Sequence, residues 1–183
     1  MRMSYWIVGI PAAALLAAAL VHERPRNPPV DRDHSLDAAL KVPPRIQEVL
    51  HRACYDCHSS ETHWPWYSAV TPVSGLMERD VRRARQVMNL SEWTITAGAS
   101  PARAAATLNA VCAAVQSGLM PKKRYKLLHP EAKLSQADVE AVCQWTHSKA
   151  AELAASIRAR RPRAELTTNL RSANNRNGAS SVQ

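Results

Sequence analysis

Apolar residues recur along the chain at intervals of three and four positions, the spacing of one face of an α-helix. The first such stripe follows Pro43 and Pro44, and proline is tolerated in the first turn of a helix. The stripe consists of Ile46, Val49, Leu50 and Ala53. The pattern therefore predicts a helix that runs directly into residue 54.

Two further helices are predicted downstream. One spans Ser74 to about Met88 and has a charged face and an apolar face. The residues expected to face inward are Leu76, Met77, Val81, Ala84 and Val87. The other helix spans Pro101 to Gln116 and stops at Gly118, because glycine readily adopts the backbone conformation that ends a helix.

A fourth helix is predicted after Ser135, where Ser-Gln-Ala-Asp at 135–138 resembles a capping box with Asp in place of the usual Glu or Gln. This helix continues to about Arg158. Its apolar face contains Val139, Val142, Cys143, Thr146 and Ala150.

The segments between these helices have no regular apolar period. They are a Pro-rich aromatic stretch at 59–75, a turn at 89–93 and a loop at 119–134. No alternating strand pattern and no internal repeat is visible in the sequence. We therefore predict an all-α fold, a small helical bundle with Pro-rich loops.

The chain divides into four parts by composition. Residues 1–21 are mostly apolar and are predicted to be a signal anchor or a signal peptide. Residues 22–41 are charged and contain prolines, which predicts an extended linker. Residues 42–157 are predicted to form the folded domain, and residues 158–183, rich in Arg, Asn and Ser, a disordered basic tail.

The apolar run at 5–21 has two interpretations. Its length is at the lower limit for a membrane-spanning helix, and we expect an uncleaved anchor. The alternative is cleavage after Ala19, although Leu20 and Val21 continue the apolar run and no polar region precedes the site. In both cases Arg2 favours the cytoplasmic side, so the rest of the chain is expected on the periplasmic side of the cytoplasmic membrane.

The formal net charge of +9 comes from clusters at 79–85, 122–126 and 158–176. A basic protein can bind nucleic acid, an anionic membrane surface or an acidic protein. No nucleic-acid-binding motif accompanies the charge, so nucleic acid is not an expected partner. The cluster at 122–126 can dock an acidic redox partner, and an ordinary solvated face is the alternative.

The strongest chemical signal is the pentapeptide Cys-Tyr-Asp-Cys-His at residues 54–58. Two cysteines three positions apart lie about one helical turn from each other, so both sulfurs can bond the vinyl groups of one haem. A zinc site would need a second close pair of ligands, and a thioredoxin-like redox pair would follow a strand. The other cysteines are far apart and no strand is predicted. We therefore predict one haem c, covalently bound to Cys54 and Cys57, with His58 on the iron.

The other axial position of the iron determines its chemistry. Met120 lies in a loop before Pro121, which stiffens the backbone, and we expect this methionine to bind the iron. His129 and an open position are the alternatives. Met77 and Met88 belong to a predicted helix, where methionine more often packs in the core. Ligation by His and Met suits electron transfer, whereas an open position suits ligand binding or peroxide chemistry.

The remaining cysteines, Cys112 and Cys143, each lie on a predicted helix. Outside the cytoplasm they can form a disulfide that closes a loop of about 30 residues around the proposed ligand loop. The alternative is two small apolar residues in a helix interface. Three aromatic residues are expected to line the haem pocket, with core packing as the alternative: Trp64, Trp66 and Tyr67.

Several unusual segments occur in the order found in one bacterial family. They are residues 54–62, Trp-Pro-Trp-Tyr-Ser at 64–68, Asn-Leu-Ser-Glu-Trp at 89–93, Met-Pro at 120–121 and the run at 125–135. Between Asn27 and Trp145 the chain resembles a family of short exported proteins known as a haem-binding domain with a single CxxCH. The resemblance implies one covalent haem and a periplasmic role. More distantly, the helix before CxxCH and the Met-Pro loop resemble class I cytochromes c, which supports the fold class and Met120 by analogy.

Together these features describe a monohaem c-type cytochrome that transfers electrons to or from a redox partner protein. The alternative is a haem-based sensor or gas-binding module with a displaceable sixth ligand. A peroxidase-type enzyme is the third interpretation, and it needs an open iron position and a distal acid/base residue. Nothing in the sequence marks such a residue, so we expect a carrier rather than an enzyme.

Overall fold

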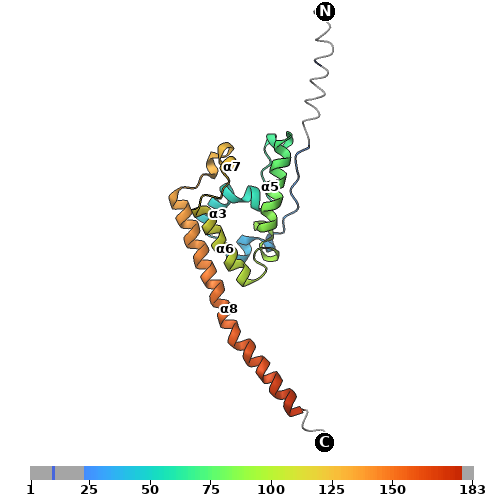
Figure 1. The fold of residues 1–183 in the computed structure, drawn as a ribbon, viewed down its shortest axis with the longest axis vertical. Helices are drawn as coiled ribbons and strands as arrows, with labels where there is room; N and C mark the ends of the chain where they lie inside the picture. The colour runs from blue at the N-terminus through green and yellow to red at the C-terminus, as the bar shows by residue number, and fades with distance from the viewer. Residues whose placement is uncertain (1–9, 11–22, 179–183) are drawn as a thin grey trace, which may run out of the picture. The chain divides into compact units, whose positions relative to one another are not determined.

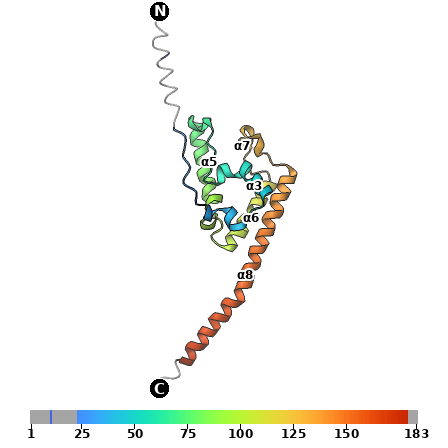
Figure 2. The same cartoon turned by 180° about the vertical axis from the view of Figure 1, so that it is seen from behind.

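The computed structural model describes residue 10 and residues 23–178, and it describes side chains as far as residue 160. The chain forms two compact units, Met1–Thr96 and Ala97–Gln183, so the predicted domain at 42–157 is divided between them. Helices are the only regular elements in the described part of the chain (Figures 1 and 2). The prediction of an all-α fold is confirmed.

The first unit begins with a segment that was expected to be an extended linker. Residues 23–31 have no helix, but η1 (Arg32–His34) and α2 (Leu36–Leu40) are short helices. The Oγ of Ser35 caps α2 by accepting a hydrogen bond from the backbone N–H of Ala38 at 3.2 Å. Leu36 is almost completely buried, so this part of the segment belongs to the core of the unit.

The helix before the pentapeptide forms as predicted. It runs without a break through α3 (Pro44–Leu50), the π-helical η2 (His51–Tyr55) and α4 (Asp56–His58). The stripe residues Ile46, Val49 and Leu50 are buried. The helix ends at Ser59, where the backbone becomes extended. A π-helical turn inside an α-helix is rare and frequently marks a functional site.

The rest of the first unit consists of η3 (Trp66–Ala69), α5 (Val73–Val87) and η4 (Leu90–Ile95). The predicted inward face of α5 is confirmed at Val81, which is buried, but Leu76 is 42% and Val87 is 72% exposed. The core continues instead beyond the helix, where Leu90 and Trp93 of η4 are buried. A turn was predicted at residues 89–93, and a 3-10 helix occupies most of that position.

The second unit is built on two helices that lie side by side, α6 (Pro101–Gln116) and α8 (Gln136–Gly178) (Figures 1 and 2). The bounds of α6 match the prediction. Ser100 caps its first turn through the backbone N–H of Arg103 at 3.2 Å. Gly118, two residues after the end of α6, has a φ of 68°, a backbone conformation that is strained for residues other than glycine.

The capping box of α8 is confirmed with its unusual aspartate. The Oδ2 of Asp138 accepts from the backbone N–H of Ser135 at 2.9 Å, and the Oγ of Ser135 accepts from the N–H of Asp138 at 3.1 Å. The helix continues beyond Arg158 to Gly178, through much of the tail that was predicted to be disordered.

Between α6 and α8 the structure has two short helices where the sequence predicted only a loop. They are α7 (Lys123–Leu128) and η5 (Pro130–Ala132). His129 joins them: its ring stacks on that of Tyr125 with centroids 4.2 Å apart, and its Nδ1 lies 3.0 Å from the Oε1 of Glu131.

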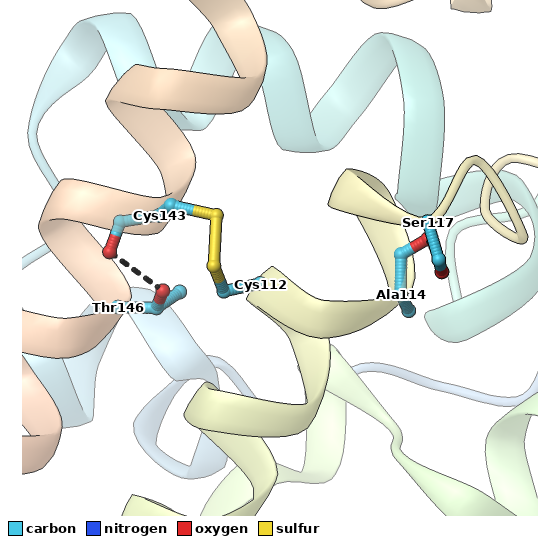
Figure 3. Close-up of a disulfide and its surroundings, with 5 residues drawn as sticks. All are labelled: Cys112, Ala114, Ser117, Cys143 and Thr146. Atoms are coloured by element: carbon cyan, nitrogen blue, oxygen red, sulfur yellow. Dashed lines mark hydrogen bonds between the residues drawn. A yellow bond between two sulfur atoms is a disulfide. The ribbon is translucent and has the colours of Figure 1, made fainter.

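A disulfide between Cys112 of α6 and Cys143 of α8 is confirmed (Figure 3). Both residues are buried, and their Cα atoms are 4.7 Å apart. Beside it, the hydroxyl of Thr146 donates to the carbonyl oxygen of Cys143 at 3.1 Å. The two helices are therefore joined covalently at the centre of their contact.

No helix in the described part of the chain is long and apolar enough to cross a membrane. The predicted signal anchor or signal peptide lies outside the described residues, apart from residue 10.

Candidate functional site

The pentapeptide at 54–58 occupies the last turn of the helix that begins at Pro44. Cys54 lies in the π-helical segment η2, and Cys57 and His58 lie in α4. Both cysteines are half-buried and neither is part of a disulfide. The cysteines are three positions apart in a continuous helix, so their side chains lie about one turn apart, as a two-point attachment requires.

Tyr55, between the cysteines, anchors the motif to the N-terminal segment. Its ring stacks on His51 with centroids 3.9 Å apart, and its phenol donates to the Oδ2 of Asp37 at 3.1 Å. The Nε2 of Gln47 donates to the other carboxylate oxygen at 3.2 Å. Burial raises the pKa of the Tyr55 phenol, and the carboxylate of Asp37 raises it further.

Replacing Tyr55 by phenylalanine should lower the free energy of unfolding by about 1–2 kcal/mol, because a buried hydrogen bond to a carboxylate is lost. The raised pKa predicts how this difference varies with pH. Folding favours the neutral phenol, so its contribution is fully present below pH of about 10 and declines as the unfolded chain ionises above that value. Urea unfolding of both proteins from neutral pH to pH 11 tests this. A difference that stays constant above pH 10 would contradict it.

Asp56 closes the loop that follows the motif. Its Oδ1 accepts from the backbone N–H of His63 at 2.8 Å, and its carbonyl oxygen accepts from the hydroxyl of Thr62 at 2.8 Å. The Oγ of Ser59 donates back to the carbonyl of Tyr55 at 2.8 Å. The two residues between the cysteines therefore fix the chain on both sides of His58.

His58 has a defined orientation. Its Nδ1 lies 3.1 Å from the carbonyl oxygen of Met88, the residue that caps the end of α5. A carbonyl oxygen only accepts hydrogen bonds, so Nδ1 carries the proton and the lone pair is on Nε2. This is the usual arrangement of a metal-binding histidine, whose second nitrogen donates to a carbonyl or a carboxylate.

Buried polar residues hold Met88 against the segment after His58. The backbone N–H of Ser60 donates to the Oγ of Ser91 at 3.0 Å, and the Nδ2 of Asn89 donates to the Oγ of Ser60 at 3.4 Å. The Oδ1 of Asn89 in turn accepts from the N–H of Ser91 at 3.1 Å. The sequence marked Asn-Leu-Ser at 89–91 as part of a turn and of a family segment, but these long-range bonds leave no local signal.

The electrostatics of the Cys54 thiol disfavour a disulfide-exchange site. Burial, followed by the charge of Cys57, raises the pKa of the Cys54 thiol to about 12. Redox-active cysteines depend instead on a thiolate stabilised by a lowered pKa. The residues that the structure describes contain no cluster of three or more His, Cys, Asp or Glu side chains that could hold a metal ion by themselves.

The model of a protein family described as the haem-binding domain matches residues 13–148 of the chain. The chain belongs to this haem-binding domain family. No curated protein and no solved structure matches it significantly. The resemblance inferred from the separate segments is thereby confirmed over most of the chain.

The residues of this haem-binding domain fit the group that the family name implies. Cys54 and Cys57 offer two thiols on one turn, and the lone pair of His58 is on Nε2, the nitrogen opposite the one that donates to Met88. In the second unit, Trp145 is buried, and its Nε1 has no hydrogen-bond partner among the described residues. A buried N–H of this kind usually has a hydrogen-bond acceptor.

Met120, the predicted sixth ligand, belongs to the second unit. It follows Gly118 at the end of α6, and its backbone N–H donates to the carbonyl of Ala114 at 3.1 Å. This bond fixes the backbone of Met120 relative to α6, while its side chain is 36% exposed. His129, the alternative ligand, stacks on Tyr125 and bonds to Glu131. Met88 is buried in the first unit, in agreement with a packing role.

The three aromatic residues expected to line the haem pocket lie in different environments. The Nε1 of Trp64 donates to the Oδ1 of Asn27 at 3.0 Å, and Trp66 is 70% exposed. Tyr67 is half-buried and meets the ring of Trp66 edge-on, with centroids 5.7 Å apart. Their contact with haem stays a prediction.

Proposed function

We propose that this haem-binding domain is an exported monohaem c-type cytochrome that transfers electrons. The observation that carries the proposal is the hydrogen bond from the Nδ1 of His58 to the carbonyl of Met88. It keeps the imidazole in the tautomer whose Nε2 lone pair can bind a metal, at the end of a helix that also presents Cys54 and Cys57.

In this proposal the protein residues attach and orient the group. Cys54 and Cys57 would hold haem through thioethers, and His58 and Met120 would bind its iron. When bound, haem would supply a one-electron change of iron oxidation state, and ligation by histidine and a thioether would favour the reduced state. Met120 is 36% exposed and its backbone is held by α6, which supports the ligand assignment.

Export is part of the same proposal. Disulfides persist in oxidising compartments such as the bacterial periplasm, and the bond between Cys112 and Cys143 supports a location there. The apolar N-terminal segment would either anchor the chain at residues 5–21 or be cleaved. The domain would then lie on the periplasmic side of the cytoplasmic membrane.

The surface at α7 supports an acidic redox protein as the partner. Lys123 and Arg124 are exposed, and beside them Leu127 is 81% and Leu128 is 63% exposed. Transient interfaces commonly combine a small apolar centre with charges that steer the encounter. The sequence already showed the positive charge of this segment. The structure adds that the segment is helical and that Leu127 and Leu128 are exposed on it.

Absorption spectra of the purified exported protein, oxidised and reduced, with and without carbon monoxide, test the function. A low-spin spectrum with a thioether-to-iron charge-transfer band and no reaction with carbon monoxide is the expected result. A high-spin spectrum that changes readily with carbon monoxide would contradict the carrier and favour the sensor or the peroxidase.

Replacing Met120 by alanine should abolish the thioether-to-iron band and allow carbon monoxide to bind. The matched control is Met77→Ala, because Met77 is half-buried on α5 and is not the proposed ligand. We expect the control to keep the band unchanged. A band that survives in Met120→Ala but disappears in Met77→Ala would transfer the ligand assignment to Met77.

A further inference from the structure

Arg85 differs from the other arginines of α5. The sequence groups it with Arg79, Arg82 and Arg83 as a basic helix face. Those three side chains are exposed, whereas that of Arg85 is half-buried. A long cationic side chain loses hydration when it is buried, so its position needs compensating hydrogen bonds.

The guanidinium of Arg85 binds the segment that follows His58. Its Nε donates to the carbonyl oxygen of Ser59 at 2.7 Å, and its Nη2 donates to the Oγ1 of Thr62 at 2.9 Å. The Nη2 also donates to the Oδ1 of Asn27 at 3.0 Å. The planar fork thus joins the residue next to His58, the loop after it and the N-terminal segment.

The same end of α5 holds the acceptor for His58. Met88 caps the helix three residues after Arg85, and its backbone N–H donates to the carbonyl of Ala84 at 2.9 Å. One helix end therefore contacts the chain at His58 and at Ser59, through the Met88 carbonyl and the Arg85 guanidinium. If the Arg85 contact were lost, the chain at His58 and Ser59 would be held to this helix end only through the Met88 carbonyl.

The charge of Arg85 also lies within electrostatic range of the attachment site. Burial lowers the pKa of its guanidinium, and the charges of Glu92 and Cys57 oppose this. Arginine nevertheless stays protonated at every physiological pH. A fixed positive charge near an iron centre favours the reduced state, which is less positive by one unit.

We propose that Arg85 is a positioning residue that holds His58 in its metal-binding orientation and raises the reduction potential of the site. The inference rests on the proposed function. It adds a residue that does not touch the iron, acts through its hydrogen bond to Ser59, and tunes how readily the site accepts an electron.

The test compares Arg85→Gln with Arg83→Gln in the haem-loaded protein. Both variants remove one positive charge from the same helix, but only Arg85 contacts Ser59 and Thr62. We expect Arg85→Gln to lower the equilibrium constant for reduction about tenfold, which corresponds to about 59 mV for a one-electron couple. Arg83 is exposed and screened by water and salt, so its variant should leave the potential unchanged.

A third variant, Arg85→Lys, separates charge from geometry. It keeps the charge, so its potential should stay close to that of the wild type, but an ammonium group cannot reproduce the fork. The Nδ1 proton of His58 should then exchange with solvent several-fold faster, which NMR measures. Equal potentials in Arg85→Gln and Arg83→Gln, or an unchanged exchange rate in Arg85→Lys, would overturn the inference. A wild-type chain without bound haem would instead overturn the proposed function, and the effect on the potential with it.

Discussion

Replacing both Cys54 and Cys57 by serine should give a chain with no covalently bound haem. Serine keeps the size and position of each side chain, but a hydroxyl does not add to a vinyl group as a thiol does. Each single variant retains one thiol and should carry haem through one thioether at reduced yield. The intact mass of the denatured, exported protein measures attachment directly, because only a covalent group survives denaturation.

The control is the other pair of cysteines. Cys112→Ala/Cys143→Ala removes the same number of sulfur atoms but leaves both motif thiols, so this variant should still carry haem. The opposite pattern would contradict the assignment: a haem adduct that survives in the serine variant would assign attachment to other residues. Equal loss in both double variants would show that attachment depends on the fold of the second unit rather than on the two thiols.

Removing the disulfide should have the largest effect on stability. Cys112 and Cys143 are 31 positions apart, and a loop of that length contributes about 3–4 kcal/mol to the free energy of unfolding through chain entropy. We expect Cys112→Ala/Cys143→Ala to unfold at a urea concentration lower by about 1.5–2 M. Alanine is preferable to serine here, because a hydroxyl buried between α6 and α8 would add an unrelated desolvation cost.

The reducing agent provides an independent check. A thiol reductant added to the wild type should lower its urea midpoint towards that of the double alanine variant, and it should leave the variant itself unaffected. An alanine variant that unfolds at the wild-type urea concentration would contradict the stabilising role. In that case the bond would be a product of the oxidising compartment without energetic consequence.

Local signals in the sequence predicted the helices that have clear ends. Pro44 and Pro101 begin helices, Gly118 ends one, and the capping box at Ser135 begins another. These residues act on the backbone within one turn, so their effect does not depend on the rest of the fold. The apolar pattern of α5 was less informative, because Val87 is exposed although it continues the stripe of Val81.

The two cysteines and the histidine of the motif stand out in the sequence because the chemistry of covalent haem attachment requires this spacing. The residues that support them do not. Tyr55 contacts Asp37, and Arg85 contacts Asn27, across distances in sequence that no periodicity reveals. The segment at 22–41 has the composition of a linker, yet its Asp37 accepts a hydrogen bond from Tyr55 of the motif. The sequence does not reveal this contact, because one hydrogen bond does not change the average polarity of twenty residues.

The pairing of Cys112 with Cys143 also has a consequence for the biogenesis of the protein. Four cysteines can be joined in three ways, and two of those would join both motif sulfurs to the second unit. Once the bond between α6 and α8 has formed, Cys54 and Cys57 can form an intramolecular disulfide only with each other. If the chain is exported and binds haem as proposed, a disulfide between Cys54 and Cys57 is the intramolecular bond that would block attachment, and its reduction would restore both thiols.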